Sequence, residues 1–169
     1  MSSPRKSRAP FDPRTWLAAL RSAQPQDAYE RGVAALDAGR LQEAFVTLGD
    51  ALNSAVDDGA RVAARNKRGV VAVGLGRRAE ALEDFHAALA LDARYAPALV
   101  NLGNLSLEDG RIDEAIEYYQ AALRADDQYS GAHRNMGIAC KRIGRHADAV
   151  RHLRIATRLE IRQAMKRRR

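Results

Sequence analysis

The chain has 169 residues, of which 46% are hydrophobic and only 5% are aromatic. This length can bury a working core, and the strand-like alternation of Val, Ile and Thr is missing, so we expect an all-α protein. The net charge of +7 is concentrated at the ends, with +4 in residues 1–24 and +5 in residues 161–169. A single cysteine, Cys140, excludes an intrachain disulfide. No apolar run is long enough to cross a membrane, so a cytoplasmic location is expected.

The N-terminal part is predicted to form two segments. Residues 1–10 combine two prolines with basic side chains and show no periodicity, which predicts a disordered basic tail. Residues 11–24 are predicted to form an N-terminal capping helix, because Asp12 and Pro13 make a favourable helix start. This helix either covers the open end of the structure that follows or docks in a groove of a neighbouring molecule.

From residue 25 onward the chain repeats itself. Three sets of residues recur at a step of 34: Gly69, Gly103 and Gly137; Ala81, Ala115 and Ala149; and Gly76, Gly110 and Gly144, each followed by an arginine. An earlier copy carries Gly32, Gly39 and Ala44 at an offset of 37. A period of this length predicts stacked pairs of helices.

The copy at residues 96–129 shows the unit most clearly. Its first helix is expected to run to about Leu107, and Gly110 is expected to end it with a positive φ angle. The second helix should begin near Asp113, whose carboxylate complements the positive end of the helix dipole. Small and aromatic residues at helical spacing should then meet the first helix: Ala115, Tyr119 and Ala122.

These positions resemble the signature of the tetratricopeptide repeat family, which has Leu-Gly in the first helix, a turn glycine, and then Ala and an aromatic residue in the second. In the clearest copy this signature is Leu102-Gly103, Gly110, Ala115, Tyr119 and Ala122-Leu123. The resemblance implies a right-handed α-α superhelix, or solenoid, with an extended C-terminal helix. We place its four repeats over residues 25–160, at about 25–61, 62–95, 96–129 and 130–160.

The sequence departs from the family pattern at several positions, and two of these departures concern how the units are joined. The proline that commonly closes each unit is replaced by Ala93 and Asp127, and extra residues around Val56–Arg61 should lengthen the connection between the first two units. Neither departure argues against the fold.

The first helices of such repeats line a concave groove. Asn101, Asn104 and Asn135 should meet at the junction of the third and fourth units, and an amide can both donate to and accept from a peptide backbone. In peptide-binding members of the family, asparagines at the positions of Asn104 and Asn135 do this, so the resemblance implies the same here. The predicted partner-binding residues are Asn66, Val70, Val73, Asn101, Asn104, Arg134, Asn135, Ile138, Lys141 and Arg142.

The basic residues near the groove indicate which kind of ligand it would prefer. Arg134, Lys141 and Arg142 favour an acidic partner or a C-terminal carboxylate. The full carboxylate clamp of chaperone-binding relatives is absent, because Val100 stands in place of its first lysine. The acidic third unit and the basic fourth unit would also permit head-to-tail self-assembly.

The last helix carries a basic stripe at steps of three and four, which continues into residues 161–169 as a basic extension. Thr157 stands where a following unit would pack, which favours a polar end cap, whereas Ile161 and Met165 do not fit a purely polar cap. Three interpretations stay open: an end cap, a surface for a protein partner or self-association, and a site for nucleic acid or anionic membrane. The stripe consists of Arg151, Arg154, Arg158, Arg162, Lys166 and Arg169.

No catalytic motif is present, and the four histidines are dispersed along the sequence without metal-ligand spacing. We therefore expect no enzyme activity, no metal and no cofactor. The sequence favours an adaptor or scaffold that binds a peptide segment or partner protein in the groove. The alternative is binding of nucleic acid or anionic membrane through the basic N- and C-terminal ends.

Overall fold

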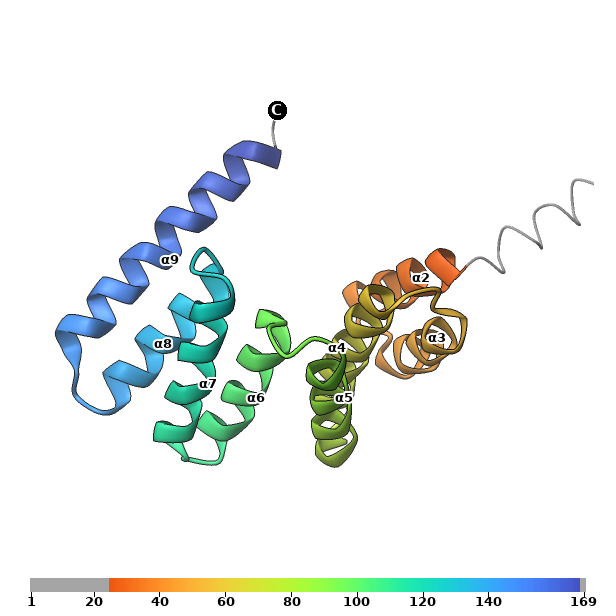
Figure 1. Cartoon of the computed structure of the whole chain (residues 1–169), viewed down its shortest axis with the longest axis horizontal. Helices are drawn as coiled ribbons and strands as arrows, with labels where there is room; N and C mark the ends of the chain where they lie inside the picture. Colours follow the sequence, from red (N-terminus) through yellow and green to blue (C-terminus); the bar gives the residue numbers. More distant parts are fainter. Residues whose placement is uncertain (1–24, 168–169) are drawn as a thin grey trace, which may run out of the picture.

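A computed structural model describes residues 25–167 (Figure 1). The predicted tail at 1–10, the predicted capping helix at 11–24 and Arg169 lie outside the described residues. Within residues 25–167 the chain forms helices and no strand: α2 (Pro25–Asp37), α3 (Leu41–Ser54), α4 (Asp58–Gly74), α5 (Arg78–Leu91), α6 (Ala96–Glu108), α7 (Ile112–Ala125), α8 (Ser130–Arg142) and α9 (His146–Arg167).

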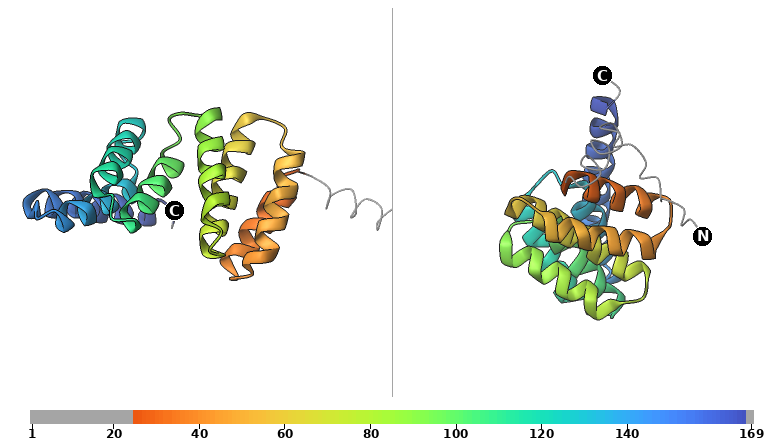
Figure 2. Two further views of the ribbon diagram at one scale, coloured as in Figure 1. Left: turned by 90° about the horizontal axis from the view of Figure 1, so that it is seen from below. Right: turned by 90° about the vertical axis from the view of Figure 1, so that its right-hand side faces the viewer.

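The helices stack as four consecutive pairs. Each pair packs tightly within itself, and its second helix contacts the first helix of the next pair. Figures 1 and 2 show the resulting elongated stack, with α2 and α3 at one end and α9 at the other. The predicted all-α solenoid is therefore confirmed. None of the helices in the described range is both long and apolar enough to span a membrane.

The turn between the two helices of each pair is built on a glycine. Gly39, Gly76, Gly110 and Gly144 have φ angles of 72°, 73°, 77° and 77°, a region that disfavours side chains with a Cβ. The residue after each glycine bonds back to the preceding helix, as where the Arg111 N–H donates to the Ser106 carbonyl at 2.9 Å. The same Arg111 pairs with Glu114 in the first turn of α7, at 2.6 Å. The recurring Gly-Arg pair therefore ends one helix and begins the next.

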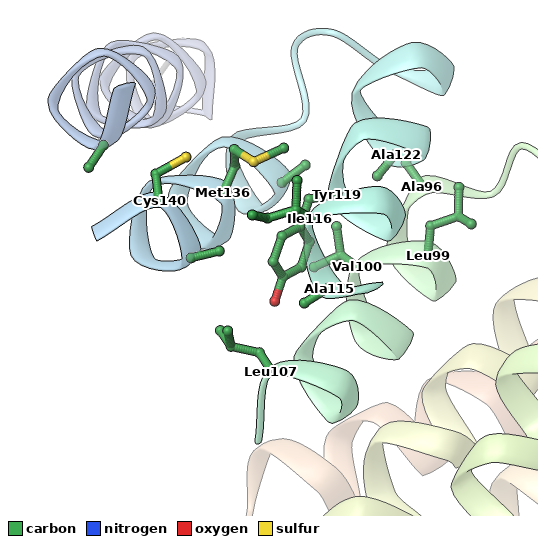
Figure 3. Close-up of a cluster of buried hydrophobic side chains, with 13 residues drawn as sticks. Ala96, Leu99, Val100, Leu107, Ala115, Ile116, Tyr119, Ala122, Met136 and Cys140 are labelled. Carbon is green, nitrogen blue, oxygen red and sulfur yellow. The ribbon is translucent and has the colours of Figure 1, made fainter. Parts of the chain in front are cut away.

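The second recurring glycine of each unit lets the paired helices approach closely. A Cβ at Gly103 would lie 2.5 Å from the ring of Tyr119, and one at Gly69 would lie 2.6 Å from the ring of Phe85. Figure 3 shows Tyr119 packed with Ile116 and Met136 in the core shared by α6, α7 and α8. The aromatic residue thus fills the space that the glycine leaves.

Two helices differ in length from their counterparts. The extra residues near Val56–Arg61 were expected to lengthen a connection, but α4 has 17 residues where α6 has 13. The insertion instead forms an added turn at the start of α4, which Asp57 caps by accepting from the Ala60 N–H at 2.7 Å. At the other end, α9 is extended to 22 residues, while α7 has 14.

A buried carboxylate joins the two helices of the second pair. Asp84 is fully buried on α5 and accepts hydrogen bonds from Arg65 at 2.9 Å and from Arg68 at 2.7 Å, both on α4. The Arg68 guanidinium also lies over the ring of Phe45 on α3, 5.3 Å from its centroid. Since a buried charge needs a partner, this cluster fixes how α4 and α5 pack.

Candidate functional site

Asparagines of neighbouring first helices bond to one another. Asn101 on α6 donates to Asn66 on α4 at 2.9 Å, and Asn135 on α8 donates to Asn104 on α6 at 2.6 Å. The Asn104 oxygen also accepts from the Tyr119 hydroxyl at 2.9 Å. The asparagines therefore form two bridges between repeats, one from the second unit to the third and one from the third to the fourth.

The second bridge leaves a matched pair of groups unused. Within the described residues, no partner bonds to the Asn104 Nδ2 donor or the Asn135 Oδ1 acceptor. An amide nitrogen can donate to a peptide carbonyl, and an amide oxygen can accept from a peptide N–H. Because Tyr119 and Asn135 both bond to the Asn104 oxygen, they also fix how the Asn104 amide is turned.

The remaining predicted asparagine is not accessible in the same way. Asn66 is only 5% exposed and accepts from Asn101, so it holds Asn101 in place and does not face a ligand. Asn101 is half-buried, and among residues 25–167 no group donates to its side-chain oxygen.

A small pocket lies beside these asparagines. It has a volume of about 110 Å³, well above the ~10–15 Å³ that a cavity needs to hold one water. This is room for a short aliphatic side chain. The pocket joins the predicted apolar residues to the asparagines, and it is lined by Val70, Val73, Phe85, Asn101, Asn104, Leu105 and Glu108.

The predicted cations of the groove differ in what they contact. Arg142 donates to the Leu107 carbonyl at 2.9 Å and so closes the end of α6. Arg134 is paired with Glu160 of α9. Lys141 is exposed and takes part in no ion pair within the described residues. Of the three, Lys141 is the cation most available to an acidic ligand, and exposed Ile138 lies one turn before it on α8.

The predicted basic stripe lies on the outer side of α9. Its members within the described range are all exposed, and only Arg151 has an ion pair there, with Asp148 at 3.4 Å. Arg154 and Arg158 border a surface hollow of about 670 Å³, together with Val150, Leu153, Thr157 and Ile161. Apolar and basic side chains are therefore mixed on this surface.

Two of the histidines that are dispersed in sequence meet in space. The Nδ1 atoms of His133 on α8 and His152 on α9 lie 2.9 Å apart, and the Nε2 of His133 lies 3.0 Å from the Asp127 carbonyl. The two histidines are 19 residues apart, a separation that brings two positions of one helix pair together across its turn. This spacing is the signal from which their contact could have been predicted. Across the described part of the chain, no cluster of three or more metal-ligating side chains forms.

Comparison with known proteins identifies the repeats. Residues 66–130 match the family model described as tetratricopeptide repeat. No match was found among curated proteins.

Solved structures share the fold over most of the chain. A crystal structure of MamA is 22% identical, with a TM-score of 0.65, and the match covers 90% of this chain and 88% of that one. PilF of Pseudomonas aeruginosa is 27% identical, with a TM-score of 0.70, and covers 82% of this chain and 62% of that one. YrrB, described as a tetratricopeptide protein with an unusual peptide-binding site, is 21% identical with a TM-score of 0.58, covering 83% of this chain and 71% of that one.

Tetratricopeptide repeat proteins generally mediate protein–protein interactions. The family match, the shared solenoid and the recurring glycine and alanine positions agree with one another. Residues 66–130 therefore match tetratricopeptide repeats, and the chain shares the solenoid fold of solved structures of this kind.

Proposed function

We propose that this chain is a non-enzymatic adaptor that holds an extended peptide segment of a partner protein against its first helices. The observation that carries the proposal is the Asn104–Asn135 pair, which presents one free donor and one free acceptor at fixed positions. Groups held in place before binding lose less conformational entropy when the ligand arrives. The family's general role in protein interactions and the peptide-binding site attributed to YrrB support this proposal.

The ligand's chemistry follows from the neighbouring side chains. With its backbone on the asparagine pair, a bound peptide would place one aliphatic side chain in the pocket beside Val70 and Val73. Val73 and Ile138 are 38% and 40% exposed, so both have apolar surface to bury. An acidic side chain of the ligand would meet Lys141. We therefore expect a short segment that carries an aliphatic residue and, nearby, an acidic one.

In the experiment, a random library of displayed linear peptides is first selected for binding to the whole chain. Calorimetry then compares the selected peptide's affinity for the wild type and for the Asn104→Ala, Asn135→Ala double variant. Loss of two hydrogen bonds predicts an affinity about tenfold to a hundredfold weaker. Asn53→Ala, an exposed asparagine on α3, is the matched control and should bind like the wild type. An unchanged affinity in the double variant, with helicity retained, would rule out this site.

A further inference from the structure

The outer face of α9 carries an apolar row that the rest of the solenoid would normally cover. We define the α9 stripe as Val150, Leu153, Thr157 and Ile161. The residues 34 positions earlier, Ile116 and Tyr119 of α7, are 8% and 0% exposed, in a core that α7 shares with α6 and α8. Val150 and Leu153 are 48% and 38% exposed. The α9 stripe is therefore the surface on which the first helix of a following unit would lie.

The end of α9 does not have the composition of a solubilising cap. A terminal repeat normally turns a polar face to solvent. Here Ile161 and Met165 are 52% and 64% exposed, one turn apart, beyond the point where the earlier second helices end. These two residues extend the apolar row instead of ending it.

Charge limits what can cover the stripe. Arg154, Arg158, Arg162 and Lys166 form no ion pair with any described residue, and the first two border the hollow over the stripe. An incoming helix with acidic side chains along one edge would complement these cations. Two α9 helices would bring like charges together, and α2 of a second copy exposes Arg31 as well as Glu30 and Asp37, so its charge is mixed.

We propose that the α9 stripe docks an acidic amphipathic helix of a partner protein. The way α8 covers α7 shows the required shape, with small and apolar residues at the spacing of Ala132, Met136 and Cys140. Nucleic acid would use the arginines but would leave the apolar row uncovered. A membrane-surface helix carries a broad apolar face, often with aromatic side chains, whereas this stripe is one row wide and has none. The inference does not depend on the proposed groove.

The probe is a labelled synthetic peptide of residues 130–142, stapled to keep it helical, with Arg134, Lys141 and Arg142 replaced by Glu and Cys140 by Ala. A second peptide keeps the basic residues and serves as the charge control. Fluorescence anisotropy with the whole chain should show that the acidic peptide binds about tenfold more tightly than the basic one. Equal binding of the two peptides, or no binding of the acidic one, would overturn the proposal.

Variants of the chain test the location. Val150→Glu with Ile161→Glu, and separately Arg154→Glu with Arg158→Glu, should each weaken the acidic peptide about tenfold or more. Val46→Glu is the control for the first pair, since Val46 is 56% exposed on α3. Arg31→Glu with Arg94→Glu makes the same change of charge outside α9 and should have little effect. Acidic-peptide binding that survives both α9 variants would overturn the proposal.

Two further ligands separate the competing interpretations. A DNA duplex and vesicles containing phosphatidylserine are titrated against the same variants at physiological salt. We expect that neither the duplex nor the vesicles bind α9 more tightly than the acidic peptide does. Tighter binding of either one, lost in Arg154→Glu with Arg158→Glu, would assign the surface to nucleic acid or to lipid instead.

Discussion

His133 and His152 face each other across α8 and α9, at the two positions that Arg65 and Asp84 occupy across α4 and α5 two repeats earlier. Each pair is 19 residues apart, so the repeat brings the same two positions together each time. One unit places an arginine and a buried carboxylate there, and another places two imidazoles. Two equivalent positions of the repeat thus form different contacts between paired helices in different units.

The histidine contact predicts that acid weakens the last repeat. Burial, followed by the charge on His133 and on Arg151 and Arg145, lowers the pKa of His152 below 6.5, while Asp148 opposes the shift. A base with a lowered pKa takes up fewer protons in the folded state, so stability is lost as the pH falls through 6.5 towards the folded pKa. Urea unfolding between pH 7.5 and 5.5 should show this loss, and His152→Gln should reduce it. A wild type equally stable across this range would contradict the prediction.

Removal of the buried carboxylate should destabilise the second pair of helices. Asp84→Ala leaves the guanidinium groups of Arg65 and Arg68 without their partner, and we expect a loss of about 3 kcal/mol in the free energy of unfolding. Denaturant titration of the variant and the wild type measures this loss in the free energy of unfolding. Asp50→Ala, at an exposed position on α3, should change stability by less than about 0.5 kcal/mol. Similar effects of the two variants would contradict the role assigned to Asp84.

Two glycines should respond in opposite ways to alanine. In Gly103→Ala the new Cβ would lie 2.5 Å from the Tyr119 ring, so the helices must move apart and we expect a loss of about 1–3 kcal/mol. In Gly49→Ala, inside α3, the nearest atom is the end of the Arg68 side chain at 3.8 Å, so we expect a gain of about 0.5–1 kcal/mol. Thermal unfolding of both variants checks this. A stabilised Gly103→Ala would show that close approach of α6 and α7 is not required.

The hydroxyl of Tyr119 should matter for both stability and peptide binding. Burial raises the pKa of Tyr119 to about 12, so the hydroxyl stays protonated and donates to Asn104. Tyr119→Phe should cost about 1 kcal/mol and weaken peptide affinity, because the Asn104 amide is then held by Asn135 alone. Tyr118→Phe, the adjacent residue on α7, is the control. Equal affinities of the two variants would show that Tyr119 does not position Asn104.

Backbone architecture was predictable from the sequence because it depends on single recurring residues. The turn at Gly110 and its equivalents needs a positive φ angle, which glycine adopts, and the ring of Tyr119 leaves no room for a Cβ at Gly103. Each of these constraints acts within one unit. The spacing of such residues therefore predicts the solenoid, whatever stands elsewhere in the unit.

Contacts between side chains were less predictable. The sequence placed Asn101, Asn104 and Asn135 together, yet which amide bonds to which depends on the twist between neighbouring units. For the same reason the pairing of Arg134 with Glu160 and the contact of Arg142 with the Leu107 carbonyl were not foreseen. Both contacts leave Lys141 as the main cation for a ligand, and the charge preference of the groove stays a prediction.

The central claim is that the first helices, and the Asn104–Asn135 pair above all, contact a bound peptide. Titration of the isotope-labelled chain with the selected peptide, followed by NMR, tests it most directly. We predict shifts of the side-chain amide signals of Asn104 and Asn135 and of backbone signals in α6 and α8. Shifts confined to α5, α7 or α9, with both asparagine signals unmoved, would contradict it.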